Sequence, residues 1–243
     1  MIDLNADLGE TDGDLALLAV VTSANVACGG HAGDSASMAL AVETALARGV
    51  VIGAHAGYED RENFGRVELG LPEEEAAAAV ARQLEALREV AEAAGTHVSY
   101  LKLHGALYHR ASAAPRLAEL VCDVLESAGC PGVLARQGAL LDAARRRRLP
   151  TATEGFCDRG YEADGGLVDR GRPGAVLGHE ASLRQARSLA LRGQAIAVDG
   201  SAVSVPVDSL CLHGDTPGAL ALAVDVRREL EAAGVVVRSC FGP

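Results

Sequence analysis

Strand-like and helical segments alternate along almost the whole chain of 243 residues. Stretches rich in β-branched residues predict the strands, with boundaries uncertain by about two to four residues. Repeated strand–helix units are typical of a mostly parallel sheet covered by helices, either open and doubly wound or closed into a barrel. The predicted strands are Ile2–Asp7, Val20–Ala27, Val50–His55, Val98–His104, Gly132–Ala135, Thr151–Phe156, Val207–His213 and Val235–Cys240, with Gln194–Val198 as a weaker ninth candidate.

The segments between the strands carry helix signals. Pro72 and the acidic run Glu73–Glu75 mark the beginning of one helix, and Gly95 marks its end. Similar signals predict helices at Asp34–Arg48, Pro115–Ala128, Gln137–Arg147, Glu180–Arg192 and Thr216–Ala233. The glycine-rich stretch Asp158–Pro173 predicts a long loop, which we expect to be mobile and to act as a lid or as a docking surface for partners.

The composition narrows the classes of function. Hydrophobic residues make up 49% of the chain, and we expect residues 1–243 to form one domain. The net charge of −11 argues against binding to nucleic acid or to an acidic membrane surface. No apolar run is long enough to span a membrane, and the sequence begins without a secretory signal. Six cysteines without a C-x-x-C pair predict free thiols in a reducing cytoplasm.

Polar and titratable residues gather where the predicted strands end. The carboxyl ends of parallel strands share one face of the sheet, so residues far apart in the chain should meet at one site. The sixth strand, for example, leads through Glu154 into Asp158 and Arg159. The candidate site residues are Asp7, Glu10, Asn25, His31, His55, Lys102, His104, Asp158, Arg159, His213 and Asp215.

The three strand-end histidines, His55, His104 and His213, could each be a buried structural residue. All three lie at equivalent positions and are followed within two residues by glycine, which lets backbone approach a ligand closely. That repetition favours function over structure. The inward-facing carboxylate of Asp7 needs a partner, a metal or a substrate, because an unpaired buried charge is unfavourable. Lys102 is the natural cation for it.

Two nucleotide-binding motifs do not occur in the sequence. It contains neither G-x-x-x-x-G-K-[ST] nor G-x-G-x-x-G, so this chain has no sequence support for cradling the phosphates of ATP. The glycine-rich segment Cys28–Asp34 could hold an anion at a helix N-terminus, but Asp34 serves equally well as an ordinary helix cap.

Seven motifs, in order along the chain, resemble the LamB/YcsF family. They are Leu4–Glu10, Ser23–Gly29 with His31–Asp34, Ile52–His55, Asn63–Arg66, Lys102 with His104–Tyr108, Asp158–Tyr161 and Cys211–Asp215. The sequence departs from the family pattern at Gly30 (usually Phe), Ala56 and Leu103 (usually Pro) and His109 (usually Asn). All four departures flank candidate site residues and do not replace them.

The resemblance implies a distorted (β/α) barrel of about seven mostly parallel strands, related to the glycoside hydrolase/deacetylase superfamily. It further implies the A component of prokaryotic 5-oxoprolinase, which opens 5-oxoproline to L-glutamate at the expense of ATP. In that family, partner subunits of the B and C types are thought to phosphorylate the lactam, and the A component completes hydrolysis. We therefore expect ATP to be handled by partners and not by this chain.

Within this interpretation, Asp7 and His55 are expected to activate water. We expect Lys102 and His104 to stabilise an oxyanion or a phosphate, and His213 with Asp215 to form a second proton-transfer pair. The remaining candidates are expected to anchor the substrate, with the Arg159 guanidinium as a fork for a carboxylate; they are Glu10, Asn25, His31, Asp158 and Arg159.

Two other functions stay open at this stage. One is an autonomous metal-dependent deacetylase or amidohydrolase, with Asp7, His31 and His55 as metal ligands around an activated water. The other is a binding or scaffolding subunit that has lost catalysis. Whether a metal binds at all is not decided by the sequence.

Overall fold

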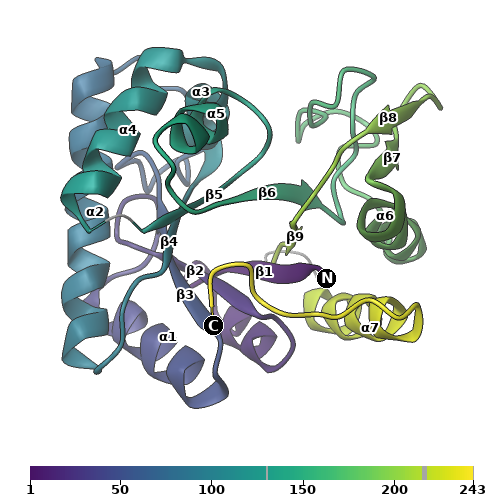
Figure 1. The fold of residues 1–243 in the computed structure, drawn as a ribbon, viewed down its shortest axis with the longest axis horizontal. Coiled ribbons are helices and arrows are strands. Elements are labelled where there is room, and N and C mark those ends of the chain that lie inside the picture. Colours follow the sequence, from purple (N-terminus) through teal and green to yellow (C-terminus); the bar gives the residue numbers. More distant parts are fainter. Residues whose placement is uncertain (130, 215–217, 243) are drawn as a thin grey trace.

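Seven parallel strands close into a barrel. The computed structural model describes residues 1–129, 131–214 and 218–242. Around the barrel the order is β1-β2-β3-β4-β5-β6-β9, which is the (β/α) barrel that the sequence predicts (Figure 1). The barrel strands are β1 (Asp3–Leu8), β2 (Ser23–Ala27), β3 (Val51–Ala56), β4 (Tyr100–Leu103), β5 (Gly132–Ala135), β6 (Thr151–Phe156) and β9 (Ser209–Leu212).

Helices follow the strands and pack around the barrel (Figure 1). The helices are α1 (Ser35–Arg48), α2 (Glu73–Ala93), α3 (Gly105–Ala113), α4 (Pro115–Ser127), α5 (Ala139–Arg146), α6 (His179–Arg192) and α7 (Ala219–Ala232), with the 3₁₀ helix η1 (Asp14–Ala19) between β1 and β2. Helix α4 packs against both α2 and α5, and α6 packs against α7. Helix α1 begins with a capping box in which Asp34 Oδ1 accepts from the Ser37 backbone N–H at 2.8 Å.

The predicted helices all form, within one to three residues at their described ends. Thr216 and Pro217, the predicted start of the last helix, lie outside the described residues. The sequence did not predict η1 or α3, which begins at Gly105 and is separated from β4 by His104 alone. Among the described residues, no helix is both long and apolar enough to cross a membrane.

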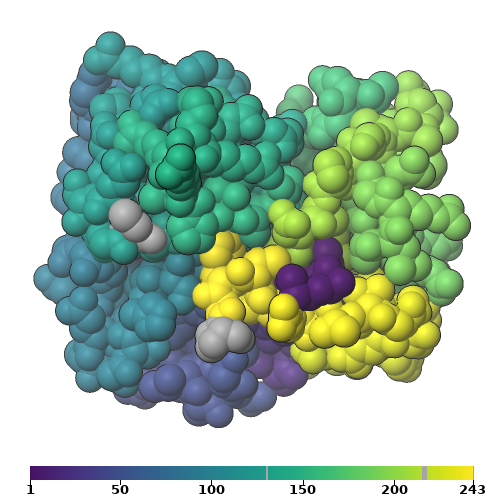
Figure 2. Space-filling view, viewed as in Figure 1, coloured from purple at the N-terminus to yellow at the C-terminus, as the bar shows by residue number. Residues whose placement is uncertain are grey.

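The predicted strand Val235–Cys240 is wrong. Strand β9 pairs with both β1 and β6, so the barrel is already closed and offers no edge to another strand. The segment instead runs beside the chain start, where the Ile2 N–H donates to Val236 O and the Arg238 N–H donates to Ile2 O. Figure 2 shows these C-terminal residues, in yellow, against the N-terminal residues, in purple.

The weaker strand candidate at Gln194–Val198 does form, outside the barrel. Strand β7 (Gln194–Ile196) pairs antiparallel with β8 (Ala202–Ser204), which the sequence did not predict. This two-stranded sheet lies beside α6 in Figure 1, and the chain then runs from β8 into the barrel as β9.

The barrel interior is unusually polar. Along β1, Asp3, Asn5 and Asp7 alternate with apolar residues and are all buried. At the amino end of the strands, Asp3 accepts hydrogen bonds from the Ser23 and Ser209 hydroxyls at 2.8 and 2.5 Å. The Phe241 ring stacks on the buried Tyr100 ring at 4.5 Å between centroids. The C-terminal segment therefore covers the amino end of the barrel and keeps water from it.

The long loop after β6 is anchored at its base. The Arg159 guanidinium is buried and donates to Val168 O at 2.7 Å and to Ala175 O at 3.0 Å. Tyr161 is buried and forms a bridge to Leu167, whereas residues 169–174 are exposed. A lid motion of Asp158–Pro173 stays a prediction, and the anchored base would confine such a motion to the exposed tip.

Replacing Phe241 with Ala should destabilise the barrel, because it leaves the Tyr100 ring uncovered. We expect the free energy of unfolding to fall by about 2 kcal/mol, less than for a fully buried Phe because Phe241 is half-buried. Urea titration followed by circular dichroism measures it. Val236→Ala, an exposed position in the same segment, is the matched control and should change stability by less than about 0.5 kcal/mol. Equal effects of the two variants would contradict the covering role.

Candidate active site

Strand register brings the candidate residues together at the carboxyl end of the barrel. Asp7 on β1 pairs with Asn25 on β2, and His55 on β3 pairs with Lys102 on β4. Within each pair, the two positions lie side by side on neighbouring parallel strands, and the His55–Lys102 pair lies two residues further along its strands than the level of Asp7 and Asn25. Chain separation is thus no obstacle to contact, as the polar residues at the predicted strand ends indicated.

Lys102 lies at the centre of the site and is buried, with 3% of its side chain exposed. Its ammonium crosses the barrel from β4 and contacts Asp7 Oδ1 on β1 at 2.8 Å and Glu154 Oε1 on β6 at 2.8 Å. It also lies 3.3 Å from Cys211 Sγ. Two carboxylates on different strands therefore hold one fixed positive charge.

The charges in this cluster stabilise one another. Burial would lower the pKa of Lys102, but Asp7, Cys211 and Glu154 outweigh it and raise that pKa well above its usual value. Burial would likewise raise the pKa of Asp7, but the charges of His55 and Lys102 hold it well below the ordinary range. Lys102 is thus an ammonium and Asp7 a carboxylate at neutral pH.

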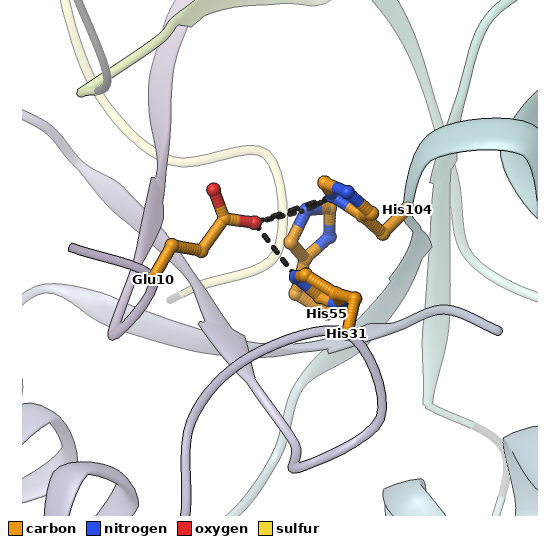
Figure 3. Close-up of side chains that lie close together, drawn as sticks. All are labelled: Glu10, His31, His55 and His104. Atoms are coloured by element: carbon orange, nitrogen blue, oxygen red, sulfur yellow. Dashed lines mark hydrogen bonds and ion pairs between the residues drawn. The ribbon is translucent and has the colours of Figure 1, made fainter. Parts of the chain in front are cut away.

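Three histidines surround the carboxylate of Glu10 (Figure 3). Glu10 Oε1 lies 2.8 Å from His31 Nε2, 3.2 Å from His104 Nδ1 and 3.4 Å from His55 Nε2. His104 Nδ1 also lies 2.9 Å from His55 Nε2, and the rings of His31 and His104 are stacked at 3.7 Å between centroids. The four residues follow or end four successive strands, β1 to β4.

The three imidazoles have different electrostatic surroundings. Burial lowers the pKa of His31 to about 4, despite the hydrogen bond to Glu10, and also lowers the pKa of His104. Burial acts against protonation of His55 too, but the charge of Asp7 and hydrogen bonds to Asp7 and Glu10 outweigh it and raise its pKa to about 9. Without a bound metal, the positive charge of this cluster therefore resides on His55.

His213, which follows β9, pairs with Asp158, which follows β6. His213 Nδ1 lies 2.9 Å from both carboxylate oxygens of Asp158, and the His213 backbone N–H donates to Oδ2 at 3.2 Å. Asp158, which the sequence predicted as a substrate anchor, thus orients this imidazole. Asp215, the expected partner of His213, lies outside the described residues.

A cavity of about 240 Å³ opens over these groups. Seven of the predicted site residues line it: Asp7, Glu10, His55, Lys102, His104, Arg159 and His213. Asn25, His31 and Asp158 do not; they support lining residues from behind. Asn25 donates to Asn5 and Asp7 at 2.8 Å each and accepts from Tyr100 at 2.6 Å, so its amide is already occupied within the barrel.

Arg159 cannot offer both edges of its guanidinium to a substrate. Its Nε and one terminal nitrogen already donate to backbone carbonyls of the loop after β6. The expected role of Arg159 as a carboxylate fork stays a prediction, and these contacts add a role in holding the loop. Arg66 also lines the cavity, with its guanidinium carbon 4.8 Å from the centroid of the Phe64 ring.

Two contributors were absent from the predicted site set. Glu154 was visible at the end of the sixth predicted strand, but nothing in the sequence indicated that it faces Lys102. Tyr108, on α3, donates to Glu154 Oε2 at 2.8 Å and lines the cavity. Its place follows from α3 beginning after β4 with only His104 between them, which the sequence did not predict.

Two of the departures from the family pattern can be placed around the site. Gly30 leaves room for the side chain of Gln83, with which a Cβ at position 30 would collide. Gln83 in turn donates to Gly57 O at 2.7 Å and accepts from the Gly57 N–H at 3.1 Å, so it holds the backbone next to His55. His109 lines the cavity.

Two donor clusters among the described residues could hold a metal ion. Glu10, His31, His55 and His104 each offer one atom within 4.8 Å of the others, and so do Asp7, Cys211 and His213. The first cluster shares His31 and His55 with the conditional ligand set from the sequence, whereas Asp7 lies beside it at 3.3 Å from His55 Nε2. The second cluster already contains the Lys102 ammonium, which contacts both Asp7 and Cys211, and is unsuited to a cation.

The fold and the site define a class: a parallel barrel that gathers acid, base and cation at the carboxyl ends of its strands. A family 4 carbohydrate esterase from Streptomyces lividans shares this fold, with a TM-score of 0.52 at 11% identity over 97% of this chain and 90% of that one. The deacetylase-like fold expected from the sequence is thereby confirmed.

Closer relatives identify the family. The model of the LamB/YcsF family matches residues 2–242, and the chain belongs to this family. It is 44% identical to a protein of Agrobacterium fabrum named as an A-type 5-oxoprolinase subunit, over 98% of this chain and 97% of that protein. The crystal structure of a lactam utilization protein from Thermus thermophilus is 36% identical, with a TM-score of 0.89 over 98% of both chains.

Removal of the Lys102 ammonium should destabilise the barrel strongly. In Lys102→Met, the buried carboxylates of Asp7 and Glu154 lose their shared cation, and the free energy of unfolding should fall by about 3–5 kcal/mol. Adding Glu154→Gln removes one uncompensated charge and should restore part of the loss. Chemical denaturation of the single and double variants at neutral pH measures both effects. A double variant less stable than Lys102→Met would contradict this charge balance.

Proposed function

We propose that this chain is the subunit of an ATP-dependent 5-oxoprolinase in which 5-oxoproline is opened to L-glutamate. The observation that carries the proposal is the buried Lys102 ammonium at the cavity wall, because opening an amide develops negative charge on the carbonyl oxygen. Two relatives, one named as an A-type 5-oxoprolinase subunit and the other as a lactam utilization protein, support the same reaction.

We expect the partner subunits, and not this chain, to bind and use ATP. A five-membered lactam is a resonance-stabilised amide with little ring strain, so its opening at neutral pH needs an activating step. The sequence has no glycine cradle for phosphates, and B- and C-type subunits would supply the activated lactam. The naming of the Agrobacterium relative as one subunit supports an assembly of this kind. We place the reaction in the cytoplasm, as the cysteine pattern predicts.

The geometry suggests a division of roles. His213, oriented by Asp158 through Nδ1, transfers a proton to or from the reacting groups. Lys102 stabilises the developing oxyanion, and Asp7 with His55 holds the attacking water at the same wall of the cavity. Starting from the phosphorylated lactam, one water adds its oxygen to the carbonyl carbon while the C–N bond breaks and the nitrogen takes up protons as the amine. A second water releases the phosphoryl group as inorganic phosphate and leaves the carboxylate of glutamate.

The chief alternative is an autonomous metal-dependent deacetylase or amidohydrolase. A metal ion bound by Glu10 and the three clustered histidines would favour this alternative function. The two functions differ in their requirement for ATP and partners. A scaffolding subunit without catalysis is the third possibility, and turnover by the assembled complex distinguishes it.

The isolated chain should neither bind ATP tightly nor hydrolyse 5-oxoproline. Mixed with its B- and C-type partners, it should form glutamate and ADP in equal amounts. Coupled assays of glutamate and ADP, with each subunit omitted in turn, measure this. Robust glutamate formation by the isolated chain without ATP would refute the proposal and favour the autonomous hydrolase.

The residues of the site should act as one unit. Asp7→Asn, His55→Ala, Lys102→Ala and His213→Ala should each abolish most turnover of the assembled complex, and double variants should lose little beyond the worse single. Thermal unfolding of the same proteins separates chemistry from stability. His97→Ala, at an exposed histidine outside the cavity, is the control and should retain turnover. Destabilised histidine variants with normal specific activity would show that His55 and His213 are structural.

A further inference from the structure

We propose that Glu10, His31, His55 and His104 form a binding site for one divalent transition-metal cation. The four side chains project from the ends of β1 to β4 toward a common point (Figure 3). All three histidines are nearly completely buried, with between 1% and 6% of each residue exposed. The proposal concerns binding alone and does not depend on the identity of the substrate.

The separations between the donor atoms match a coordination shell. Metal–ligand bonds of about 2.0–2.1 Å place the corners of a tetrahedron about 3.3 Å apart. Glu10 Oε1 lies 2.8–3.4 Å from the three inner nitrogens, and the inner nitrogens of His55 and His104 are 2.9 Å apart. To surround a central ion, Glu10 Oε1 would move away from the point between the nitrogens. One of the stacked rings of His31 and His104 would also tilt, because parallel rings cannot both direct an in-plane lone pair at one ion.

The outer nitrogens fix which ring nitrogens carry lone pairs toward the centre. His55 Nδ1 lies 3.3 Å from Lys102 O, and His104 Nε2 lies 3.0 Å from Phe64 O. A carbonyl oxygen can only accept, so these outer nitrogens carry protons. Metal-binding histidines are characteristically oriented in this way, by donating their other N–H to a carbonyl or carboxylate. The inner nitrogens then face each other and Glu10, an arrangement that requires a positive charge between them.

The charge of the cluster fits a divalent ion. Asp7, Glu10 and Glu154 contribute three carboxylates, and Lys102 contributes an ammonium that contacts two of them. With neutral imidazoles, two negative charges remain uncompensated within this buried group. A single shared proton offsets one of them, and a divalent cation offsets both.

The backbone is shaped to hold the imidazoles closely. Gly57 and Gly65 lie against the stacked rings of His31 and His104, and a Cβ at Gly65 would lie 2.9 Å from His31 Cβ. Gly65 also has a φ of +62°, which favours glycine. His31 differs from the other two because its Nδ1 is buried without a partner among the described residues. We therefore expect His31 to be the weakest of the three nitrogen ligands.

The donor set indicates which metals fit. Imidazole with one carboxylate suits Zn²⁺, Co²⁺, Ni²⁺ or Fe²⁺, whereas Mg²⁺ and Ca²⁺ prefer oxygen ligands. Glu10, His55 and His104 line the cavity, so an ion can reach the site from solvent and face a bound substrate. Such an ion would supply Lewis-acid chemistry next to Lys102.

Metal binding can be measured without substrate or partner subunits. The full chain, free of any affinity tag and treated with a chelator, is titrated with ZnCl₂ by calorimetry and with CoCl₂ by visible absorption. We expect one Zn²⁺ per chain, and Co²⁺ bands of a site with nitrogen ligands. His55→Ala, His104→Ala and Glu10→Gln should each lower affinity at least about tenfold, as loss of a ligand does, and His31→Ala should lower it less. Because binding is read directly, a failure here is distinguishable from a failure of the oxoprolinase proposal.

His109→Ala is the matched control, since His109 lines the same cavity but lies outside the cluster; its affinity should equal that of the unaltered chain. Thermal unfolding with and without ZnCl₂ identifies variants that do not fold, and the unaltered chain should show a higher Tm with the metal. Absence of saturable binding to the folded unaltered chain would overturn the proposal and leave a shared proton between His55 and His104. Equal affinities of the folded His104→Ala and His109→Ala variants would overturn it as well.

Discussion

The ion pairs of Lys102 across the barrel determine how the rest of the site is arranged. Its ammonium leaves β4 and meets carboxylates on β1 and β6, so three strands that are not neighbours are joined through the lumen. A lone ammonium or a lone carboxylate would be highly unfavourable in this position, because burial removes the water that solvates it. The three charges are therefore interdependent, and each is acceptable only while the others stay in place.

The polar lumen beneath this cluster has its own requirements. Asn25 connects Asp7 to Asn5 and Tyr100, and Ser209 connects Asn5 to Asp3. Buried polar groups of this kind stabilise a fold only when nearly all of them have partners. A barrel filled in this way needs a cover at its amino end, which the C-terminal segment supplies through Phe241. The C-terminal segment thereby protects the polar lumen beneath the site, although it does not line the cavity itself.

Much of the fold could be predicted from the sequence because local patterns determine it. The strand–helix rhythm indicated a mostly parallel sheet with its site at the carboxyl ends, and the resemblance to the LamB/YcsF family implied that the sheet closes into a barrel. The error at Val235–Cys240 has a tertiary cause: the residues have strand propensity, but a closed barrel has no free edge. Helix α3 was not predicted because only His104 separates it from β4, and no loop marks the boundary between the two elements.

The sequence indicated which residues gather at the candidate site better than it indicated which of them contact one another. The sequence suggested Asp215, two positions away, as the partner of His213. Asp215 lies outside the described residues, and the structure pairs His213 with Asp158, 55 positions away. Sequence proximity suggested the first partner, whereas the second follows from β6 and β9 being neighbours in the barrel. Glu154 was missed as a partner of Lys102 because their contact spans β5, which pairs with β4 on one side and with β6 on the other.

Strand order also divides the site into two halves with different chemistry. The ends of β1 to β4 supply Glu10 and the three clustered histidines, whereas β6 and β9 supply Asp158 and His213. Asp7 and Lys102 lie between the halves, because Asp7 contacts His55 on one side and Lys102 reaches Glu154 on the other. A substrate carbonyl next to Lys102 would thus meet the histidine cluster on one face and the His213–Asp158 pair on the other. In the proposed reaction, groups on different sides of the reacting carbon could then serve water addition and proton delivery to the leaving nitrogen, and the order of strands in this barrel is what separates those groups.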